Sequence, residues 1–510
     1  MLDVRTGLSA FAAAALLAAC GGEADEGYDN NGNHPNPPVL QITKVEGRYH
    51  HGKEAPAAIT KAALHLPQTP ARTIHLPALD AVSKAALDDD SGPGAMLMAK
   101  AQAVAPTDSP AKLAQALEWV RSADGASHAA LTIHAADAFG IRLGLLVHAL
   151  PDQTLLHVYS PQGQQVHSFS GADINALLRR NAAAGDHSEE GRTWWSPDLG
   201  GDTVTLHLTL PAGLSTQALQ LALPRISHGL VDPSAFALGA SARQHGEHAQ
   251  DGEQDPHGVQ KYAPIPQASW CALDASCYKT GQAQRDAVAR MHYIKNGNGY
   301  WCTGTLLNDA LETDIPYLLT ASHCVSSQTV ANTLQTDWFF RSESCNASYV
   351  DARRTTRVRG ATLLFSSNVS QGQDMALLAL NDSAPEGTYL AGWDARLHNI
   401  WQDVYSIHHP AGGLAKITSG QTKRYGNCSR TTCQGDAHGR YYEVVWHEGT
   451  TQDGSSGAAL FSYSNHVIGV LHGGFASCTA QSRPDYHGRL DLAFEAGMKN
   501  YLAAAQRPRF

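Results

Sequence analysis

Three short segments in the second half of the chain carry side chains that could together perform nucleophilic catalysis. His323 follows the apolar run 317–319, Asp374 precedes the apolar run 375–380, and Ser456 lies in a turn of small residues. A serine hydroxyl is a weak nucleophile at neutral pH, so it needs an imidazole to accept its proton and a carboxylate to orient that imidazole. The order His, Asp, Ser is one of the known orders of a catalytic triad. We therefore expect these three side chains to meet at one catalytic site.

The turn around Ser456 also offers donors for a developing oxyanion, namely the backbone N–H groups of Gly454 and Ser456.

His323, Asp374 and Ser456 each have an alternative interpretation when taken singly, because histidines pack at strand ends, acids begin strands and serines are common in turns. Two other functions remain open: a catalytically silent surface lipoprotein that binds peptides or host proteins, and an exported esterase. The esterase turn Gly-x-Ser-x-Gly would need a glycine where this chain has Ala458.

The elements that must position these residues are predicted to be short strands. From Tyr262 onward, apolar runs such as 317–320, 375–380 and 467–471 are separated by turn residues. Many short strands with glycine-rich turns are typical of a β-barrel. We expect an all-β domain over residues 262–510, which ends in one helix at 494–506.

The preceding region, residues 39–243, differs in its residue pattern and contains no cysteine. Apolar residues alternate in 129–133, 143–147 and 204–210, which predicts strands, and 172–180 is typical of a short helix. We expect an α/β domain here. Residues 244–261 are polar and almost free of apolar side chains, so they are predicted to form a solvated linker.

The charge balance excludes several kinds of partner. The 510 residues include 37 Lys and Arg against 47 Asp and Glu, which gives a formal net charge of −10. The basic residues form no clustered stripe, so nucleic acid is not expected as a partner. Beyond the N-terminus no apolar run is long enough to span a bilayer. We expect a monomer that acts on protein or peptide substrates.

The first 20 residues are predicted to be an export signal. The apolar run 8–19 is too short to span a membrane but suits the core of a signal peptide. Its ending, Leu17-Ala18-Ala19-Cys20, resembles the lipobox of bacterial lipoproteins, in which Cys20 would be lipidated; a plain secretory signal is the alternative. Residues 21–38 are predicted to be a disordered tether. We expect either a lipid-anchored outer-membrane protein or a secreted one, and the eight cysteines besides Cys20 suit disulfides in such a location.

Residues 268–495 resemble the trypsin/chymotrypsin-like serine proteases, and within them the bacterial lysyl endopeptidases. The motifs that carry the resemblance are Thr-Ala-Ser-His-Cys at 320–324, Ala-Gly-Trp-Asp at 391–394, Ile-His-His-Pro at 407–410, Gly-Ser-Ser-Gly at 454–457, and Leu-His-Gly-Gly at 471–474 ahead of Cys478. The resemblance implies a double β-barrel preceded by a pro-region. Trp-Trp-Ser-Pro at 194–197 is similar to the pro-regions of secreted bacterial proteases.

The same resemblance implies the roles of further residues. It implies an acid for substrate cations at Asp485, a pair of stacked aromatic rings (Trp446 and His472) beside the catalytic histidine, and a substrate-binding strand at Gly473 and Gly474. The position that holds the pocket acid in trypsin is Thr450, which cannot bind a cation. Cleavage after lysine or another basic residue is therefore expected. The implied disulfides are Cys271–Cys478, Cys277–Cys345, Cys302–Cys324 and Cys428–Cys433.

Activation is expected to differ from that of animal trypsins. Those zymogens use an Asp before the catalytic serine to bind a new N-terminus, and this chain has Ser455 there. Latency is then expected to come from the pro-region, with cleavage in the linker or at Lys261. The 26 histidines are scattered and show no His-Glu-x-x-His pattern, so no metal site and no other cofactor is expected.

Overall fold

The protein is described here from a computed structural model of the chain. The residues that it describes are 39–51, 59–60, 69–80, 94–161, 163, 165–231, 268–347, 349–429 and 432–508. Cys20, the tether 21–38, the linker 244–261 and Lys261 lie outside them.

The first half of the C-terminal domain is an open, curved antiparallel sheet. Its central strand β16 (Asn298–Leu307) pairs on one side with β15 and on the other with β17. The other strands are β15 (Val288–Lys295), β17 (Tyr317–Thr320), β18 (Gln335–Trp338), β19 (Thr355–Arg357), β20 (Ala361–Ser367) and β21 (Met375–Leu380). Strands β17 and β21 coincide with two of the apolar runs in the sequence, and both are buried along their whole length. Continuous apolar runs of this kind suit strands that lie inside a core.

The second half is a closed barrel, because β29 pairs with both β28 and β30. Its strands are β24 (Asp403–His408), β25 (Lys416–Cys428), β27 (Tyr441–Glu448), β28 (Ala459–Ser462), β29 (Val467–Gly474) and β30 (Asp485–Arg489). One hydrophobic core joins the two halves and includes Leu319, Leu377 and Phe461. The expected all-β fold is confirmed. The helix expected at 494–506 instead starts at Leu490 and continues through α7 (Leu490–Ala493), a π-helical turn η7 (Phe494–Met498) and α8 (Lys499–Leu502).

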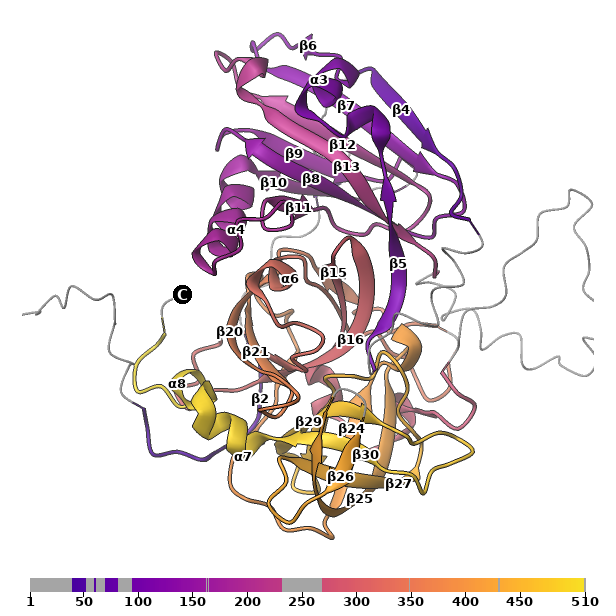
Figure 1. Cartoon of the computed structure of the whole chain (residues 1–510), viewed down its shortest axis with the longest axis vertical. Helices are drawn as coiled ribbons and strands as arrows, with labels where there is room; N and C mark the ends of the chain where they lie inside the picture. Colours follow the sequence, from indigo (N-terminus) through magenta and orange to yellow (C-terminus); the bar gives the residue numbers. More distant parts are fainter. Residues whose placement is uncertain are drawn as a thin grey trace, which may run out of the picture.

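The N-terminal domain is a sandwich of two sheets (Figure 1). One sheet has the order β3-β10-β9-β12-β7-β4, and the other contains β11, β8, β13 and β5. Their bounds are β3 (Ile59–Thr60), β4 (Ala71–Leu76), β5 (Met96–Ala103), β7 (Ser127–Ala135), β8 (Ile141–Ala149), β9 (Leu155–Tyr159), β10 (Gln165–Ser170), β11 (Thr193–Trp195), β12 (Thr203–Leu210) and β13 (Gln220–Gly229). Leu131, Leu145 and Leu206 lie in the core between them. The alternation in 129–133, 143–147 and 204–210 thus predicted β7, β8 and β12 correctly.

Among the described residues of this domain, two α-helices accompany the strands, α3 (Pro110–Ala116) and α4 (Gly171–Ala183). The second contains the predicted helix 172–180. Ser170 and Asp173 form a capping box at its start, and Ile174 and Leu177 are buried on its inner face. The domain is therefore mainly β, with its helices on the outside.

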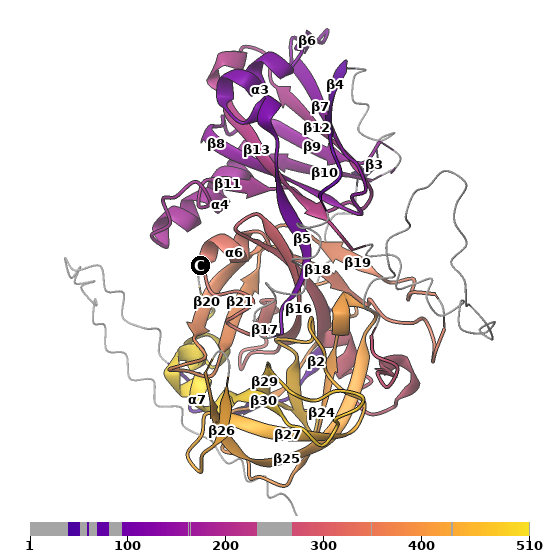
Figure 2. The same ribbon diagram turned by 45° about the vertical axis from the view of Figure 1, so that its right-hand side comes forward.

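Strand β5 connects the two domains within a single sheet. One edge of β5 pairs with β13 of the N-terminal sandwich, and the other pairs with β16 of the C-terminal domain. Figures 1 and 2 show β5 running out of the upper domain and down alongside β16. The N-terminal domain is thereby attached to the other domain through backbone hydrogen bonds as well as through side chains.

The segment that follows residue 38 lies against the C-terminal domain. Strand β1 (Lys44–Val45) pairs with β23 (Trp393–Asp394), and β2 (Arg48–Tyr49) pairs with β22 (Tyr389–Leu390). The sandwich itself begins later, so the segment 39–49 packs apart from the rest of the expected pro-region.

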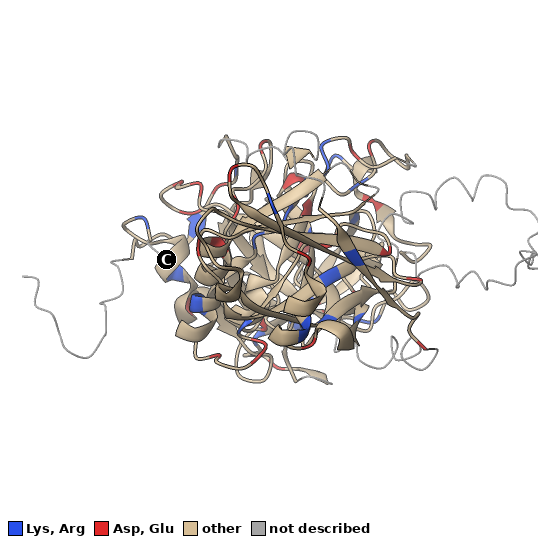
Figure 3. Ribbon diagram, turned by 90° about the horizontal axis from the view of Figure 1, so that it is seen from above, with Lys and Arg blue, Asp and Glu red and all other residues tan. Residues whose placement is uncertain are grey.

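Charged residues of both signs are interspersed along the ribbon in Figure 3. Within the described part of the chain, no helix has the length and apolar character needed to cross a membrane.

Candidate active site

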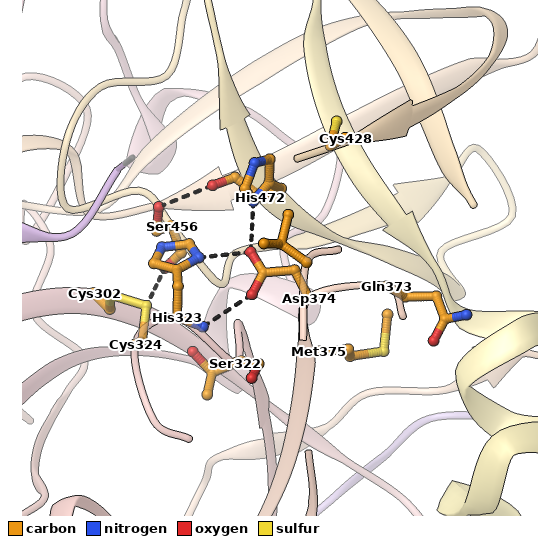
Figure 4. A network of polar contacts seen from close by, with 12 residues as sticks. Cys302, Ser322, His323, Cys324, Gln373, Asp374, Met375, Cys428, Ser456 and His472 are labelled. Carbon is orange, nitrogen blue, oxygen red and sulfur yellow. Dashed lines mark hydrogen bonds and ion pairs between the residues drawn. A yellow bond between two sulfur atoms is a disulfide. The ribbon is translucent and has the colours of Figure 1, made fainter. Parts of the chain in front are cut away.

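His323 and Asp374 meet at the junction of the two C-terminal halves (Figure 4). His323 follows β17, Asp374 precedes β21, and these two strands pair side by side. The His323 Nδ1–H donates to Asp374 Oδ2 at 2.6 Å, and the His323 backbone N–H donates to Oδ1 at 2.9 Å. The carboxylate therefore fixes both the ring and the backbone of His323, which leaves Nε2 as the nitrogen available for proton transfer.

The conformation and ionisation of Asp374 suit this role. Its φ is +50°, in the left-handed region, which non-glycine residues adopt rarely and often at functional sites. Burial alone would raise the pKa of Asp374, but the charge of His323 and hydrogen bonds from His323 and His472 outweigh it. The net effect holds the pKa of this carboxyl well below its usual range. Asp374 is thus held as an anion beside the rings of His323 and His472.

Ser456 lies at the same junction, just before β28, and is buried. Its Oγ donates to the backbone oxygen of His472 at 3.4 Å, and His323 Nε2 has no hydrogen-bond partner among the described residues. Ser456 thus lies beside His323 and Asp374 (Figure 4) without a hydrogen bond to either side chain. The Gly454 N–H, the expected oxyanion donor, donates to the backbone oxygen of Gly94 at 2.7 Å.

His472 is a second partner of Asp374. Its Nδ1 hydrogen-bonds the same Oδ2 at 2.6 Å, and its ring packs edge-on against His323 with centroids 5.8 Å apart. The expected stacking of Trp446 on His472 is not formed; the aromatic ring beside His472 is Tyr441, at 5.7 Å. Trp446 instead packs against His487. The reason is that Tyr441 and Trp446 are five residues apart on β27, so they project from opposite faces of that strand.

Replacing His472 by alanine is expected to lower kcat roughly 10- to 100-fold with little change in KM. The variant removes one hydrogen bond to a buried carboxylate, and such bonds contribute about 1.5–3 kcal/mol. The backbone oxygen near Ser456 is retained. Steady-state kinetics on a peptide ester would separate kcat from KM. His466→Ala is the matched control, since His466 is also buried next to β29 but bonds Glu46 rather than Asp374. An equal loss in both variants would contradict a positioning role.

Asp485 is buried at the start of β30, beside the strand that carries His472. Its Oδ2 accepts hydrogen bonds from Trp446 Nε1 and Thr451 Oγ1, both at 2.6 Å, and its Oδ1 accepts one from the Ala476 N–H. Burial raises the pKa of Asp485, although these hydrogen bonds oppose the shift. The described residues include no cationic side chain paired with it. A buried carboxylate without a counter-charge next to a catalytic centre is a candidate binding group for a cation.

Glycines bring β29 close to this carboxylate. Gly474 pairs with Asp485 across β29 and β30, and a Cβ at Gly474 would lie 2.2 Å from Asp485 Oδ1. Gly473 has a φ of +149°, which favours glycine. The two glycines therefore let the backbone of β29 lie close to Asp485.

Four disulfides hold the surrounding loops, and the structure forms the same four pairs that the resemblance implied. Cys302–Cys324 joins β16 to the residue after His323, and Cys271–Cys478 ties the start of the domain to the segment after β29. Cys277–Cys345 and Cys428–Cys433 close further loops.

Three groups of side chains among the described residues place potential metal donors close together. Two of these groups consist mainly of disulfide-bonded cysteines. The third is His323, Asp374 and His472, whose donor atoms already hydrogen-bond one another.

Sequence reasoning missed three residues at the site. Thr451, which binds Asp485, follows the position compared with trypsin by one residue. Ser455 Oγ hydrogen-bonds His408 Nδ1 at 2.8 Å and so anchors the turn before Ser456, in the place where the animal enzymes have an acid. The His-His-Pro motif at 408–410 was a signal for this contact. Gly94 comes from the other domain, and nothing in its local sequence predicts its position.

Comparisons with known proteins agree with the division into two domains. Residues 265–488 match the family model described as lysyl endopeptidase, C-terminal domain, and residues 73–230 match the model described as lysyl endopeptidase N-terminal domain. The chain is 30% identical to a lysyl endopeptidase of Pseudomonas aeruginosa over 389 residues, which covers 72% of this chain and 74% of the relative. It is also 26% identical to the secreted RxLR effector protein 73 of Plasmopara viticola, of which it spans 48%.

Solved structures were matched as well. The Rv3671c protease from M. tuberculosis in its active form is 16% identical, with a TM-score of 0.30 over 52% of this chain and 97% of that one. The MamO protease domain from Magnetospirillum magneticum is 11% identical, with a TM-score of 0.30 over 42% and 97%.

Proposed function

Since this chain belongs to the lysyl endopeptidase family and is a serine endopeptidase, we propose that it hydrolyses peptide bonds after lysine through Ser456, His323 and Asp374. The observation that carries the proposal is the partly buried His323–Asp374 hydrogen bond of 2.6 Å beside the Ser456 turn. The activity needs protein or peptide substrates and no cofactor.

The proposed reaction proceeds through an acyl-enzyme. His323 Nε2 accepts the proton of Ser456 while Oγ attacks the substrate carbonyl, and Asp374 stabilises the resulting imidazolium. The N–H groups of Gly454 and Ser456 stabilise the oxyanion, a contribution of roughly 100- to 1,000-fold per donor. His323 then protonates the leaving amine, and water attacks the acyl-enzyme with His323 as the base. His472 holds Asp374 in place throughout.

The proposed specificity for lysine rests on Asp485. Its Oδ2 already accepts two hydrogen bonds, from Trp446 and Thr451. Its Oδ1 accepts one longer hydrogen bond, from the backbone N–H of Ala476. A substrate ammonium is a compact point charge that needs no paired acceptors, whereas a guanidinium favours two parallel oxygen contacts. A carboxylate whose Oδ2 already accepts two short hydrogen bonds offers mainly Oδ1 to a substrate, which favours lysine over arginine.

The proposal includes export and latency. Four disulfides and the N-terminal signal suit a protein that acts outside the cytoplasm, either secreted or anchored through Cys20. Residues 39–243 act as the pro-region, and cleavage in the linker or at Lys261 begins activation.

A panel of peptides that differ only at the residue before the scissile bond tests the proposal. We expect the lysyl peptide to have the highest kcat/KM, the arginyl peptide a lower value, and a norleucyl peptide of similar length the lowest. Equal rates for lysyl and norleucyl peptides would overturn the specificity but leave the protease activity. No hydrolysis of any peptide by a chain lacking the N-terminal domain, together with tight peptide binding, would favour the catalytically silent lipoprotein.

A further inference from the structure

Among the described residues of the N-terminal domain, Gly94 lies against Gly454 and Ser456. Gly94 lies two residues before the start of β5, and its backbone oxygen accepts the hydrogen bond of the Gly454 N–H at 2.7 Å. In the proposed mechanism this N–H binds the oxygen of the substrate carbonyl. The pro-region therefore places a carbonyl of its own where the substrate carbonyl would bind.

The conformation of Gly94 fits only glycine. Its φ is +90°, which L-residues with a side chain rarely adopt. A Cβ at this position would lie 1.9 Å from Ser456 Oγ and 3.4 Å from the backbone oxygen of His472. The Cα of Gly94 thus packs directly against the Ser456 side chain.

The proposed nucleophile correspondingly makes no hydrogen bond to its base. Ser456 Oγ donates to the His472 oxygen, and the buried His323 Nε2 has no partner in the described part of the chain (Figure 4). The Asp374–His323 half of the triad is complete, whereas the His323–Ser456 half is not. Both the oxyanion donor and the serine are engaged in this precursor.

The strand that follows Gly94 supplies the binding energy for this arrangement. Met96, Leu97 and Ala99 pair with Trp301, Tyr300 and Gly299 on the edge of β16. Met96 and Met98 pack against Trp301 and Ala411 in a buried cluster. These residues lie on the C-terminal side of Gly94, where the leaving half of a substrate would lie. The pro-region thus binds as an extended strand, in the mode by which proteases and other proteins bind peptides at a sheet edge.

We propose, on the basis of the proposed function, that Gly94 is the inhibitory element of the pro-region, which blocks Ser456 and Gly454 until β5 leaves β16. Gly94 places no side chain near Asp485, so the inhibition is independent of the specificity for lysine. Cleavage within residues 232–267 leaves every contact of β5 in place. Activation therefore requires a second step, the withdrawal of β5, after the linker is cut.

Reaction of Ser456 with a fluorophosphonate, followed by intact-mass measurement, tests this inference. The reagent forms a bond between Ser456 Oγ and phosphorus as fluoride leaves, and the mass separates label on the intact chain from label on processed chains. We expect the intact Gly94→Ala chain to react roughly 10- to 100-fold faster than the intact wild type, because the added methyl cannot fit against Ser456. Gly213→Ala is the matched control: Gly213 has a φ of +85° in the same domain, with nothing within 4 Å of its Cβ position.

Equal labelling of the intact wild-type, Gly94→Ala and Gly213→Ala chains would overturn the inference, provided that processed chains freed of the N-terminal domain react. Absence of label on every chain, including processed chains freed of the N-terminal domain, would instead refute the proposed protease function. A second measurement does not depend on the folding of the Gly94 variant. In a full-length Ser456→Ala chain, which cannot form an acyl-enzyme, we expect slow hydrogen exchange at the Gly454 N–H. Exchange there at the rate of an unprotected amide would overturn the inference by itself.

Discussion

Replacing Ser456 by alanine is expected to lower kcat by about 10⁶-fold, the scale seen when a triad nucleophile is removed. In the proposed mechanism, Ser456 Oγ is the atom that bonds to the substrate carbonyl carbon. Its loss leaves the oxyanion donors and the substrate-binding strand at Gly473 and Gly474 intact. His323→Ala should cost about as much, since the members of a triad act as a unit. Hydrolysis of a lysyl ester by the processed enzyme, normalised to folded protein, measures the effect.

Ser455→Ala is the matched control for the nucleophile. Ser455 is adjacent and equally buried, but its Oγ hydrogen-bonds His408 and accepts from the Gln452 N–H. Losing these neutral hydrogen bonds should loosen the turn that positions Ser456. We expect this to raise the activation free energy by about 1 kcal/mol, which lowers the rate roughly fivefold. A loss in Ser455→Ala as large as that in Ser456→Ala would contradict the assignment of the nucleophile.

The Ser456→Ala chain also tests self-processing. Its N-terminus can be sequenced after expression alongside the wild type. Identical processing of the two chains would exclude self-cleavage as the only route of activation.

Replacing Asp485 by asparagine is expected to lower kcat/KM for lysyl peptides roughly 100- to 1,000-fold, while norleucyl peptides change little. The carboxylate is buried and has no cationic partner among the described residues, so a bound lysine would supply the only counter-charge. Removing one partner of a buried charge pair costs about 2–5 kcal/mol. Glu448→Gln is the control, since it removes one exposed acid from the same barrel without altering the hydrogen bonds to Asp485. A similar loss for lysyl and norleucyl peptides would indicate that the variant damages the fold rather than the specificity.

The pH dependence gives a second measurement on the same variant. Burial raises the pKa of Asp485, so the carboxyl is neutral at pH values where an ordinary aspartate is already charged. A neutral carboxyl cannot attract an ammonium group. The kcat/KM for lysyl peptides should therefore rise as pH rises through this elevated pKa, in addition to any change caused by the catalytic histidine. Asp485→Asn should lack this component, and so should a norleucyl peptide on the wild type.

The proposed two-step activation also bears on how the enzyme is stored. The contacts between β5 and β16 are backbone hydrogen bonds and buried methionines, so they persist after the linker is cut. A processed enzyme that still carries its N-terminal domain should therefore remain inactive, and the rate of dissociation would set the rate of activation.

Much of the fold follows from the local patterns of the sequence. The apolar runs at 317–320 and 375–380 correspond to β17 and β21, and the alternation in 204–210 corresponds to β12. These predictions succeed because burial on one or both faces of a strand imposes a periodicity that can be seen in a few residues. The serine turn and the histidine motif were equally visible, because their chemistry requires particular residue types at short spacing.

The tertiary structure decided what depends on residues far apart along the chain. Tyr441 rather than Trp446 lies beside His472, because the pairing of β27 determines which face each side chain occupies. Thr451 can donate a hydrogen bond to Asp485 only because β30 passes beside the loop that leads to Ser456. Gly94 reaches Ser456 from a position 362 residues earlier in the sequence because β5 joins the two domains in one sheet. No local pattern encodes such contacts: a glycine against a serine is specified by strand register, which is set by the packing of both domains together.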